Sequence, residues 1–479
     1  MRQPRRAVRV SAYLRLSAAV AGLAVQAAAA PDAMAHGPAR TLGAALGGPV
    51  FASAAPAGAS ALGGRFIQVG HNALGRNALN SGLALGARHA YIGNEGGRPI
   101  AILSIRRPDR PRTVGQLRQP AGETPEELRL WPRRDVLAVM TFGCRQPTCP
   151  QGVPLRWAVR LYDVRGRHAR SPRLLVTHRL VTEPHEIFLW QDPRRPDRAL
   201  LYVSTPARSG ENLVVLDISA ARRGRVREVG SWTLPPEAAP LTPDGLHSMS
   251  VSRDGRRTYL AAFGLGLMVA DTSRLAAGRA TPRIPTLTPV DNRATWPFVN
   301  AHSAVTMPGT SRYMVVADEY YGCPWGWIHV IDARDPSMPR VAAEARVPGL
   351  DDAAHCPSPI QASYSVHNPT LTRHLMIASW YGSGLQAFTL RSPTTPRRIA
   401  EFRPEPLTRV AFEEPGLTAG AEKVITTTYP ILRDGLVYVG DRRNGLYVLR
   451  YRGPFAREVR CARLVEGNSS LARAATQRC

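Results

Sequence analysis

Lysine is almost absent from this sequence. Lys423 is the only one, so arginine supplies 61 of the 62 basic residues and dominates the formal charge of +26. The arginines are scattered, often in pairs such as Arg133-Arg134, and form no basic helix or alternation with aromatic residues. Specific nucleic-acid binding asks for basic residues clustered on one face, so we expect no specific nucleic-acid partner. Weak attraction to anionic cell-envelope polymers suits this charge better.

The sequence also lacks the short motifs of several enzyme classes. It has no GxSxG, no HExxH, no P-loop and no Rossmann glycine fingerprint, so hydrolase and nucleotide-binding functions have no motif to support them. No two cysteines have the CxxC spacing of a zinc site. Long stretches of helical periodicity are missing too, which argues against an α/β fold.

The cysteines are few, and their number is even. In an exported chain an even number indicates disulfides, and six cysteines allow 15 pairings. Proximity in the sequence favours Cys144–Cys149 and Cys461–Cys479, which leaves Cys323–Cys356.

The N-terminus has the pattern of an export signal. A basic start with the twin arginine Arg5-Arg6 precedes an Ala/Leu/Val-rich run, and Ala33–Ala35 offers small residues for a signal peptidase. The twin arginine is compatible with the Tat route as well as with Sec. The run is short and alanine-rich for a membrane span. We therefore expect a signal peptide over 1–35, a flexible leader over 36–64, no transmembrane span in the mature chain, and a secreted or cell-envelope location.

One strand-like segment recurs seven times. The copies start 54 to 61 residues apart, and most end in Asp, Ser or Thr followed by an apolar residue. They are IAILSIR (Ile100), VRLYDVR (Val159), LVVLDIS (Leu213), LMVADTS (Leu267), IHVIDAR (Ile328), LQAFTLR (Leu385) and LYVLRYR (Leu446). A period of this length indicates a repeat architecture.

Each repeat has the same plan of strands and turns. A glycine-containing turn such as GLG or RNG leads into the recurring strand, and a proline-rich turn such as ARDPSMPR follows it. Four antiparallel strands per repeat predict an all-β fold, a seven-bladed β-propeller, over 65–460. We expect RFIQVG (65–70) to pair into the last blade and close the ring, and 461–479 to form a C-terminal tail.

Four consecutive repeats carry a histidine just before their innermost strand. Innermost strands line the channel of a propeller, so these imidazoles should converge near one end of it. They are His185, His247, His302 and His367. The equivalent positions elsewhere hold Asn80, about Glu126 and about Thr428. Buried clusters of titratable groups are costly unless neutral or liganded, and imidazole is the commonest transition-metal ligand. We therefore predict that these four histidines bind a metal, although structural hydrogen bonding and a metal-free small-molecule site are alternatives.

Other residues could support or extend such a site. An all-imidazole site suits iron, copper or zinc but not calcium or magnesium. Ligated histidines usually donate their second N–H to a carboxylate or a carbonyl; the candidate carboxylates are Glu95, Glu186, Asp318 and Glu319. His71 could cap the channel. The segment GCPWGWIHV (322–330) could form an aromatic binding surface, but a disulfide-tied loop packed on a blade is the preferred interpretation, and we expect Trp190 and Trp380 to pack within blades.

The segments LVVLDIS, PHEIFLWQDP, GCPWGWIHVID, YSVHNPTLT and DGLVYVGDRRNGLYVLRY resemble the bacterial LVIVD-repeat β-propeller proteins. The resemblance covers most of 65–453. That family looks distantly related to the selenium-binding protein and methanethiol oxidase group, whose histidine-rich channel is linked to copper. Carotenoid cleavage oxygenases are a further analogue, with iron held by four histidines on the axis of a seven-bladed propeller. The resemblance implies His185, His247, His302 and His367 as ligands of copper or iron.

Two functions are compatible with these features. The first is an exported metal-dependent oxidoreductase with an open coordination position for O₂ or a small thiol in the central channel. The second is a non-catalytic secreted or cell-surface protein whose rim binds an extracellular glycan or protein, with structural channel histidines. Fold alone does not choose between them.

Overall fold

The computed structural model describes residues 62–76, 79–144, 149–207, 210–242, 245–357, 363–412 and 423–468. The predicted signal peptide and most of the predicted leader therefore lie outside the described residues, as do Cys479 and its expected pairing with Cys461. Within the described ranges, no helix is long and apolar enough to cross a membrane.

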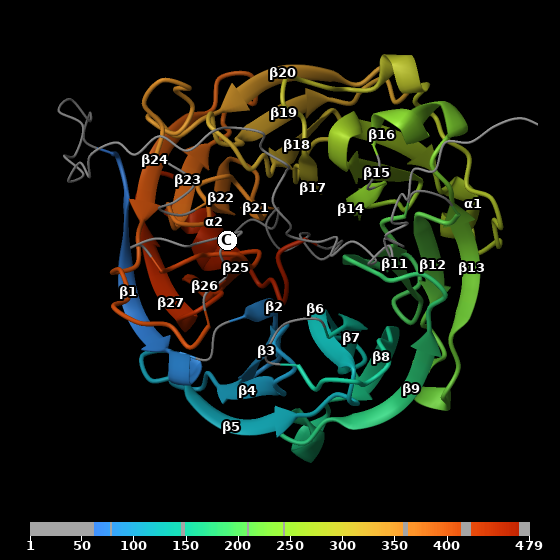
Figure 1. The fold of residues 1–479 in the computed structure, drawn as a ribbon, viewed down its shortest axis with the longest axis vertical. Helices are drawn as coiled ribbons and strands as arrows, with labels where there is room; N and C mark the ends of the chain where they lie inside the picture. The colour runs from blue at the N-terminus through green and yellow to red at the C-terminus, as the bar shows by residue number, and fades with distance from the viewer. Residues whose placement is uncertain are drawn as a thin grey trace, which may run out of the picture. The chain divides into compact units, whose positions relative to one another are not determined.

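The described strands form seven antiparallel sheets, arranged as the blades of a propeller around a central axis (Figure 1). Blade 1 contains β2 (Asn80–Leu85), β3 (His89–Asn94), β4 (Ile100–Ser104) and β5 (Arg112–Leu117); blade 2 contains β6 (Glu123–Trp131), β7 (Val136–Gly143), β8 (Ala158–Asp163) and β9 (Arg173–Arg179). Blade 3 contains β10 (Ile187–Gln191), β11 (Ala199–Ser204), β12 (Leu213–Asp217) and β13 (Arg227–Trp232); blade 4 contains β14 (Leu246–Val251), β15 (Arg257–Ala262) and β16 (Gly266–Asp271). Blade 5 contains β17 (Ala301–Thr306), β18 (Tyr313–Asp318), β19 (Ile328–Asp332) and β20 (Arg340–Ala345); blade 6 contains β21 (Pro369–Leu371), β22 (Leu375–Ser379), β23 (Leu385–Thr389) and β24 (Arg397–Phe402). Blade 7 contains β25 (Ile431–Arg433), β26 (Leu436–Asp441), β27 (Gly445–Arg452) and, from the other end of the chain, β1 (Arg65–Asn72).

The described helices are short, and all except α2, which follows the last strand, lie between strands. They are α1 (Ser273–Ala276), α2 (Ala456–Cys461), and the 3₁₀ turns η1 (Leu74–Arg76), η2 (Gly166–Ala169), η3 (Ala221–Arg223), η4 (Pro236–Leu241), η5 (Phe263–Leu265) and η6 (Val290–Asn292). The predicted seven-bladed all-β fold is confirmed, because the recurring sequence segment supplies the third strand of every blade.

Blade 4 differs from the four-stranded plan. Its sheet has three strands in the described residues, and the chain that occupies the outer position makes only isolated bridges, such as Thr281 with Gly230 and Thr286 with Ala270. This stretch reads TPRIPTLTP, 281–289. Proline has no N–H to donate to a ladder, so three prolines in nine residues prevent a regular edge strand.

In blades 2 to 5, the third strand ends in an aspartate whose side chain accepts a hydrogen bond from the backbone of the following turn. The Oδ1 atom of Asp163, Asp217, Asp271 and Asp332 accepts the backbone N–H two residues later, at 2.8–3.1 Å. Short polar side chains favour such turns because they bond their own backbone locally. The Asp of the repeated motif is thus a turn-forming residue at the end of each of these strands.

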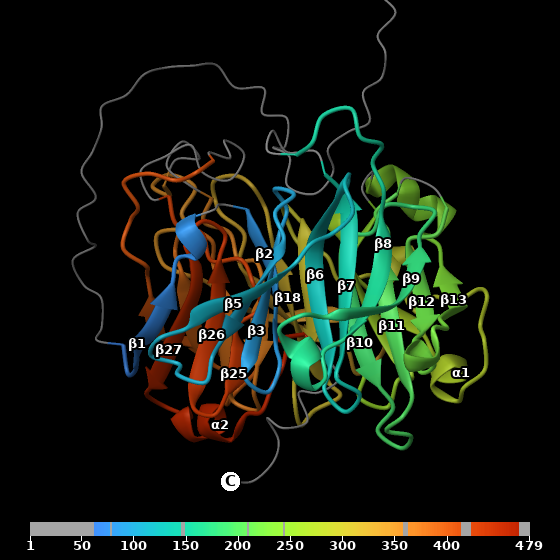
Figure 2. The ribbon, with the colours of Figure 1, turned by 90° about the horizontal axis from the view of Figure 1, so that it is seen from below.

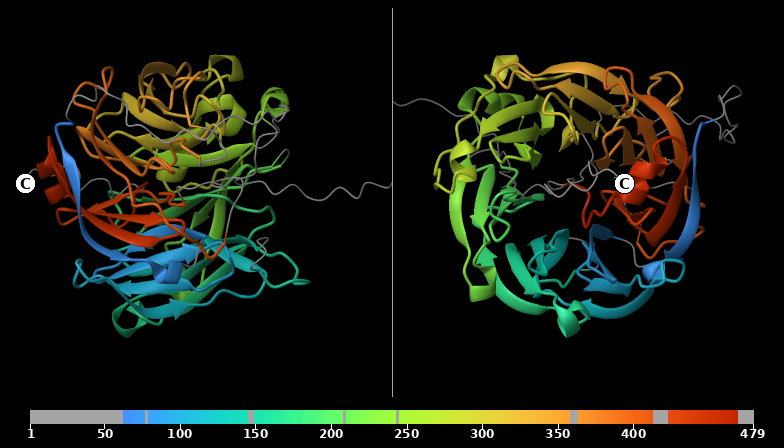
Figure 3. Two further views of the ribbon diagram at one scale, coloured as in Figure 1. Left: turned by 60° about the vertical axis from the view of Figure 1, so that its left-hand side comes forward. Right: turned by 180° about the vertical axis from the view of Figure 1, so that it is seen from behind.

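The ring closes as predicted through the N-terminal strand. β1 pairs antiparallel with β27 from Arg65↔Arg452 to Asn72↔Leu446, so both ends of the described chain contribute to blade 7 (Figures 1 and 3). His71 lies in this outer strand, where its Nε2 is 2.7 Å from the carbonyl of Asn444. The suggestion that His71 caps the channel was wrong, because β1 is the strand farthest from the axis in its sheet.

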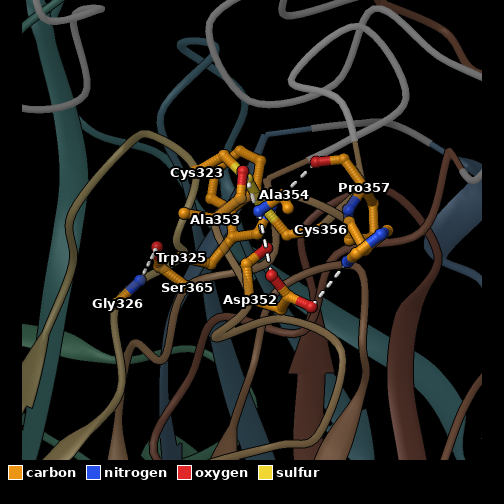
Figure 4. Close-up of a disulfide and its surroundings, with 10 residues drawn as sticks. Cys323, Trp325, Gly326, Asp352, Ala353, Ala354, Cys356, Pro357 and Ser365 are labelled. Atoms are coloured by element: carbon orange, nitrogen blue, oxygen red, sulfur yellow. Dashed lines mark hydrogen bonds and ion pairs between the residues drawn. A yellow bond between two sulfur atoms is a disulfide. The ribbon is translucent and has the colours of Figure 1, made fainter.

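Two predicted disulfides are present, Cys144–Cys149 and Cys323–Cys356. The second one ties the GCPWGWIHV segment to the loop before blade 6 (Figure 4). Trp325 is buried there and donates its indole N–H to the carbonyl of Pro357 at 2.9 Å. Trp325 therefore belongs to the packed core of blades 5 and 6, as the preferred interpretation held.

Closure by β1 can be tested by truncation. A chain that begins at residue 73 lacks β1, the outer strand of blade 7, so the edge of β27 is left unpaired. A chain that begins at residue 62 keeps β1 and its pairing with β27. We expect the shorter chain to melt well below the longer one in a thermal unfolding experiment followed by circular dichroism. Equal melting temperatures would show that β1 is not needed for closure.

Candidate metal centre on the propeller axis

The same backbone irregularity places each channel histidine. The register of β14 with β15 shifts between Leu246 and Ser248, and that of β17 with β18 shifts between Ala301 and Ser303, so His247 and His302 are the extra residues of two β-bulges. A bulge re-aims the side chain of its extra residue. In blade 2 the shift lies between Pro125 and Glu127, which gives Glu126 the equivalent place.

Blades 3 and 6 have a related arrangement. The backbone of Ser204 accepts the N–H of His185 and donates to the carbonyl of Glu186, at 2.9 Å each. Ser379 makes the same pair of bonds with His367 and Asn368, at 2.9 and 3.0 Å. In each blade, two residues on the inner strand therefore face one serine on the next strand, as in the β-bulges of blades 4 and 5.

The structure brings all four predicted histidines together in one row. Ring centroids are 4.2 Å apart for His185 and His247, 3.8 Å for His247 and His302, and 4.1 Å for His302 and His367. None of the four residues is more than 8% exposed. The row follows the order of blades 3 to 6 around the axis. Whether the four rings bind a metal stays a prediction.

Two carboxylates accompany the row, and both were among the candidates from the sequence. Glu186 accepts a hydrogen bond from Ser248 at 2.6 Å, and Tyr429 donates to it at 3.3 Å. Burial, reinforced by the charge of Glu127, raises the pKa of Glu186 to about 8. Glu319, from the end of blade 5's second strand, lies at the other end of the row.

Glu319 faces two imidazoles and two phenols. Its Oε2 lies 3.7 Å from Nε2 of His302, and its Oε1 lies 3.5 Å from Nε2 of His367. Tyr321 donates to Oε1 at 2.6 Å, and Tyr381 donates to the same oxygen. Neither phenol was predicted as a partner of Glu319. Both lie in the turns that lead into the recurring strands of blades 5 and 6, and the repeat does not show which side chain a turn residue contacts.

Two groups of three side chains have ligand atoms close enough to hold a metal ion. One is Glu186, His247 and His302, and the other is His302, Glu319 and His367. In each group the ligand atoms all lie within 4.8 Å of one another, and every member is buried. His302 is common to both. His185 lies beside the first group, with its Nε2 2.7 Å from Nε2 of His247.

The other two candidate carboxylates have different partners. Asp318 accepts the indole N–H of Trp296 at 2.7 Å and lies 3.8 Å from His329, outside the row. Glu95 forms a two-bond ion pair with Arg442, at 2.5 and 2.6 Å. Asp318 and Glu95 are therefore structural charges in the described structure, and Glu186 and Glu319 are the two that approach the imidazoles.

Acidic and basic side chains occupy the part of the axis that blades 1, 2 and 7 form. Glu95 pairs with Arg442 and Glu127 pairs with Arg129. Glu126 lies beside them, and burial together with the charge of Glu95 raises its pKa well above the ordinary value. A small cavity between these blades and blade 6 is lined by Glu95, Glu126, Arg442, His367 and Tyr381 among others.

The C-terminal segment occupies the end of the axis opposite the histidines. Leu464 N–H donates to Leu432, the carbonyl of Val465 accepts from Leu85, and the carboxylate of Glu466 accepts from Leu130. These partners lie at the ends of the innermost strands of blades 7, 1 and 2, on the side where Figure 2 shows α2. The histidines lie at the starting ends of their strands. The segment 462–468, which we expected to be part of a tail, thus lies in the channel.

The comparisons with known proteins give distant likenesses. No family model matches the chain, and no curated protein matches it. Raptor from Chaetomium thermophilum is similar at 14% identity and a TM-score of 0.48, over 80% of this chain. The chain spans only 29% of the Raptor chain. The periplasmic gluconolactonase of Pseudomonas aeruginosa is similar at 15% identity and a TM-score of 0.48, over 78% of this chain and 96% of the other.

Asp441, in the turn that carries Arg442, should make the stability of the fold depend on pH. Asp441 accepts the N–H groups of Arg443 at 2.9 Å and Asn444 at 2.7 Å, and burial raises its pKa to about 7. The folded-state pKa of Asp441 lies above its unfolded value of 3.8. The stability that Asp441 contributes is therefore fully present below pH 3.8, and it is lost as the pH rises through about 7. The melting temperature of Asp441→Asn should therefore fall less between pH 5 and pH 9 than the melting temperature of the wild type. A parallel decline in both proteins would contradict this assignment.

Proposed function

We propose that this protein is an exported, metal-dependent oxidoreductase that binds copper or iron among the histidines of its channel. The observation that carries the proposal is the buried row of four imidazoles with two adjacent carboxylates. Titratable groups at this density are expensive to bury unless they are neutral or liganded. Imidazole and carboxylate together suit first-row transition metals.

The arrangement of the channel supports a reaction site at this position. His247 and His302 lie in strands, and His185 and His367 lie two residues before strands, each bonded through its backbone N–H to the neighbouring strand. Sites built on such elements are held more precisely than sites on loops. The segment 462–468 enters the axis from its far end, and Asn468 reaches the carbonyl of Met249 and the hydroxyl of Tyr429. A bound copper or iron ion would supply one-electron chemistry and an open coordination position, and the residues around it would exclude water and orient a small substrate.

Export is the part of the proposal that rests on the sequence of 1–35. The two disulfides are compatible with an oxidising, extracytoplasmic compartment. The proposed substrate is a small molecule that enters the channel on the histidine side, since the other side is occupied by the chain itself.

A non-catalytic binding protein is the alternative function, and one observation favours it. The Nε2 atoms of His185 and His247 are hydrogen-bonded to each other at 2.7 Å, and the Nδ1 atom of His302 is 2.6 Å from the hydroxyl of Ser303. Such bonds can hold imidazoles in place without a metal.

Metal analysis of the purified, tag-free protein distinguishes the two functions. We expect close to one copper or iron ion per chain in the wild type by mass spectrometry of the elements, and almost none in the double variant His247→Ala/His302→Ala. His71→Ala, in the outer strand of blade 7, is the matched control and should keep its metal. A wild type that stays metal-free after incubation with either ion, and is no more stable for it, would favour the binding protein.

A further inference from the structure

We infer that the metal ion is an iron(II) bound by His302, His367 and Glu319, rather than by four imidazoles. This inference rests on the proposed function and specifies its ligands. Two histidines and one carboxylate on one side of a metal form a recurrent arrangement of non-haem iron sites, which leave the other positions open for small molecules. The contacts of these three residues fix which atoms face the metal.

The protonation of His302 follows from its neighbours. Ser303 has a single hydroxyl hydrogen, and it donates this hydrogen to Oδ1 of Asn368 at 2.7 Å. The hydroxyl of Tyr429 lies 3.0 Å from the Ser303 oxygen and 3.3 Å from Glu186, so its one hydrogen is shared between these two acceptors. With the Ser303 hydrogen given to Asn368, the contact of Ser303 with Nδ1 of His302 at 2.6 Å is one in which the ring donates. In the neutral imidazole this places the lone pair on Nε2, the atom that faces Glu319.

His367 has two polar neighbours at Nδ1, the backbone carbonyl of Thr427 at 2.7 Å and Nδ2 of Asn368 at 2.8 Å. The carbonyl oxygen only accepts hydrogen bonds, so a hydrogen on Nδ1 serves it and leaves the lone pair on Nε2, whereas a lone pair on Nδ1 would serve the amide of Asn368. A histidine ligand typically donates its second N–H to a carbonyl or carboxylate, which fixes the ring orientation. With the hydrogen on Nδ1, both rings present a lone pair towards the carboxylate of Glu319.

The distances between these atoms suit a shared metal ion. Nε2 of His302 is 3.7 Å from Oε2 of Glu319, and Nε2 of His367 is 3.5 Å from Oε1. These separations exceed an ordinary hydrogen bond. Two ligands at about 2.1 Å from one metal ion lie about 3.0–3.7 Å apart for angles of about 90–125° between them. Tyr321 and Tyr381 hold the carboxylate in this position through hydrogen bonds to Oε1.

The other end of the row has a different geometry. Nε2 of His185 and Nε2 of His247 are 2.7 Å apart, so one hydrogen lies between the two nitrogen atoms. That hydrogen bond engages the Nε2 atoms of both rings, and a metal bound there through Nε2 of His247 would have to displace it. These two histidines are therefore suited to support His302 by ring contact, at 3.8 Å between the centroids of His247 and His302.

The open positions of the metal would face the cavity between blades 1, 2, 6 and 7. One of the three ligands, His367, belongs to its lining, as does Tyr381, which donates to Glu319. On the cavity's far side, Arg442 is neutralised by Glu95 through two bonds. A guanidinium already paired in this way offers little attraction to an anion, so the cavity suits small uncharged molecules such as O₂.

Iron binding to single-residue variants tests the inference. Each protein would be titrated with ferrous iron under anaerobic conditions, and nitric oxide would then be added to report open positions by electron paramagnetic resonance. We expect His367→Ala and Glu319→Gln to weaken iron binding by more than about 100-fold, in line with the loss of a ligand. His185→Ala, a buried member of the same row, should weaken it less than about threefold. The wild type should give a high-spin iron–nitrosyl signal.

Glu319→Gln keeps the volume of the side chain and an oxygen for the two phenols, so its folding can be checked by its melting temperature. Iron bound equally well by Glu319→Gln and the wild type would overturn the inference. Equal losses in His185→Ala and His367→Ala would overturn it in favour of a four-imidazole site, and the proposed function would stand. A wild type that binds neither iron nor copper would instead remove the proposed function itself.

Discussion

The antiparallel pairing of β1 with β27 is the contact on which the axial site depends. A propeller converges on its axis only if its first and last sheets meet, and here the last sheet is completed by the N-terminal strand. Once the ring is closed, the innermost strands of neighbouring blades stand side by side, and β-bulges at their starting ends turn His247 and His302 towards the centre. The imidazole contacts follow from this closure.

The axis is chemically divided between two groups of blades. Blades 3 to 6 contribute imidazoles, whereas blades 7, 1 and 2 contribute carboxylates that are largely neutralised by arginines, as in the pairs Glu95–Arg442 and Glu127–Arg129. Buried charges need partners of this kind because desolvation is costly. The arginine-rich composition thus serves the interior as well as the surface. Glu126 occupies in blade 2 the bulge position that histidine occupies in blades 4 and 5.

Much of the fold could be predicted from the sequence, because the repeat of 54 to 61 residues reports the blade directly. The four histidines were found for the same reason. The irregular edge of blade 4 was not predicted, since four strands were expected in every repeat. The sequence could not separate Glu319 from Asp318, which are adjacent: which carboxylate faces His302 depends on how the end of one strand pairs with the next blade. Tyr321 and Tyr381 lie in the turns before the recurring strands of blades 5 and 6, and only the folded chain shows that both donate to Glu319.

The position of 462–468 inside the channel has a consequence for biosynthesis. Blade 7 needs residues from both chain ends, and the segment that follows it bonds to Leu85 in blade 1 and to Leu130 in blade 2. Neither closure can be completed until residues 445–468 have left the ribosome. Early blades can form their sheets before that point, but the ring itself closes only after these residues have emerged.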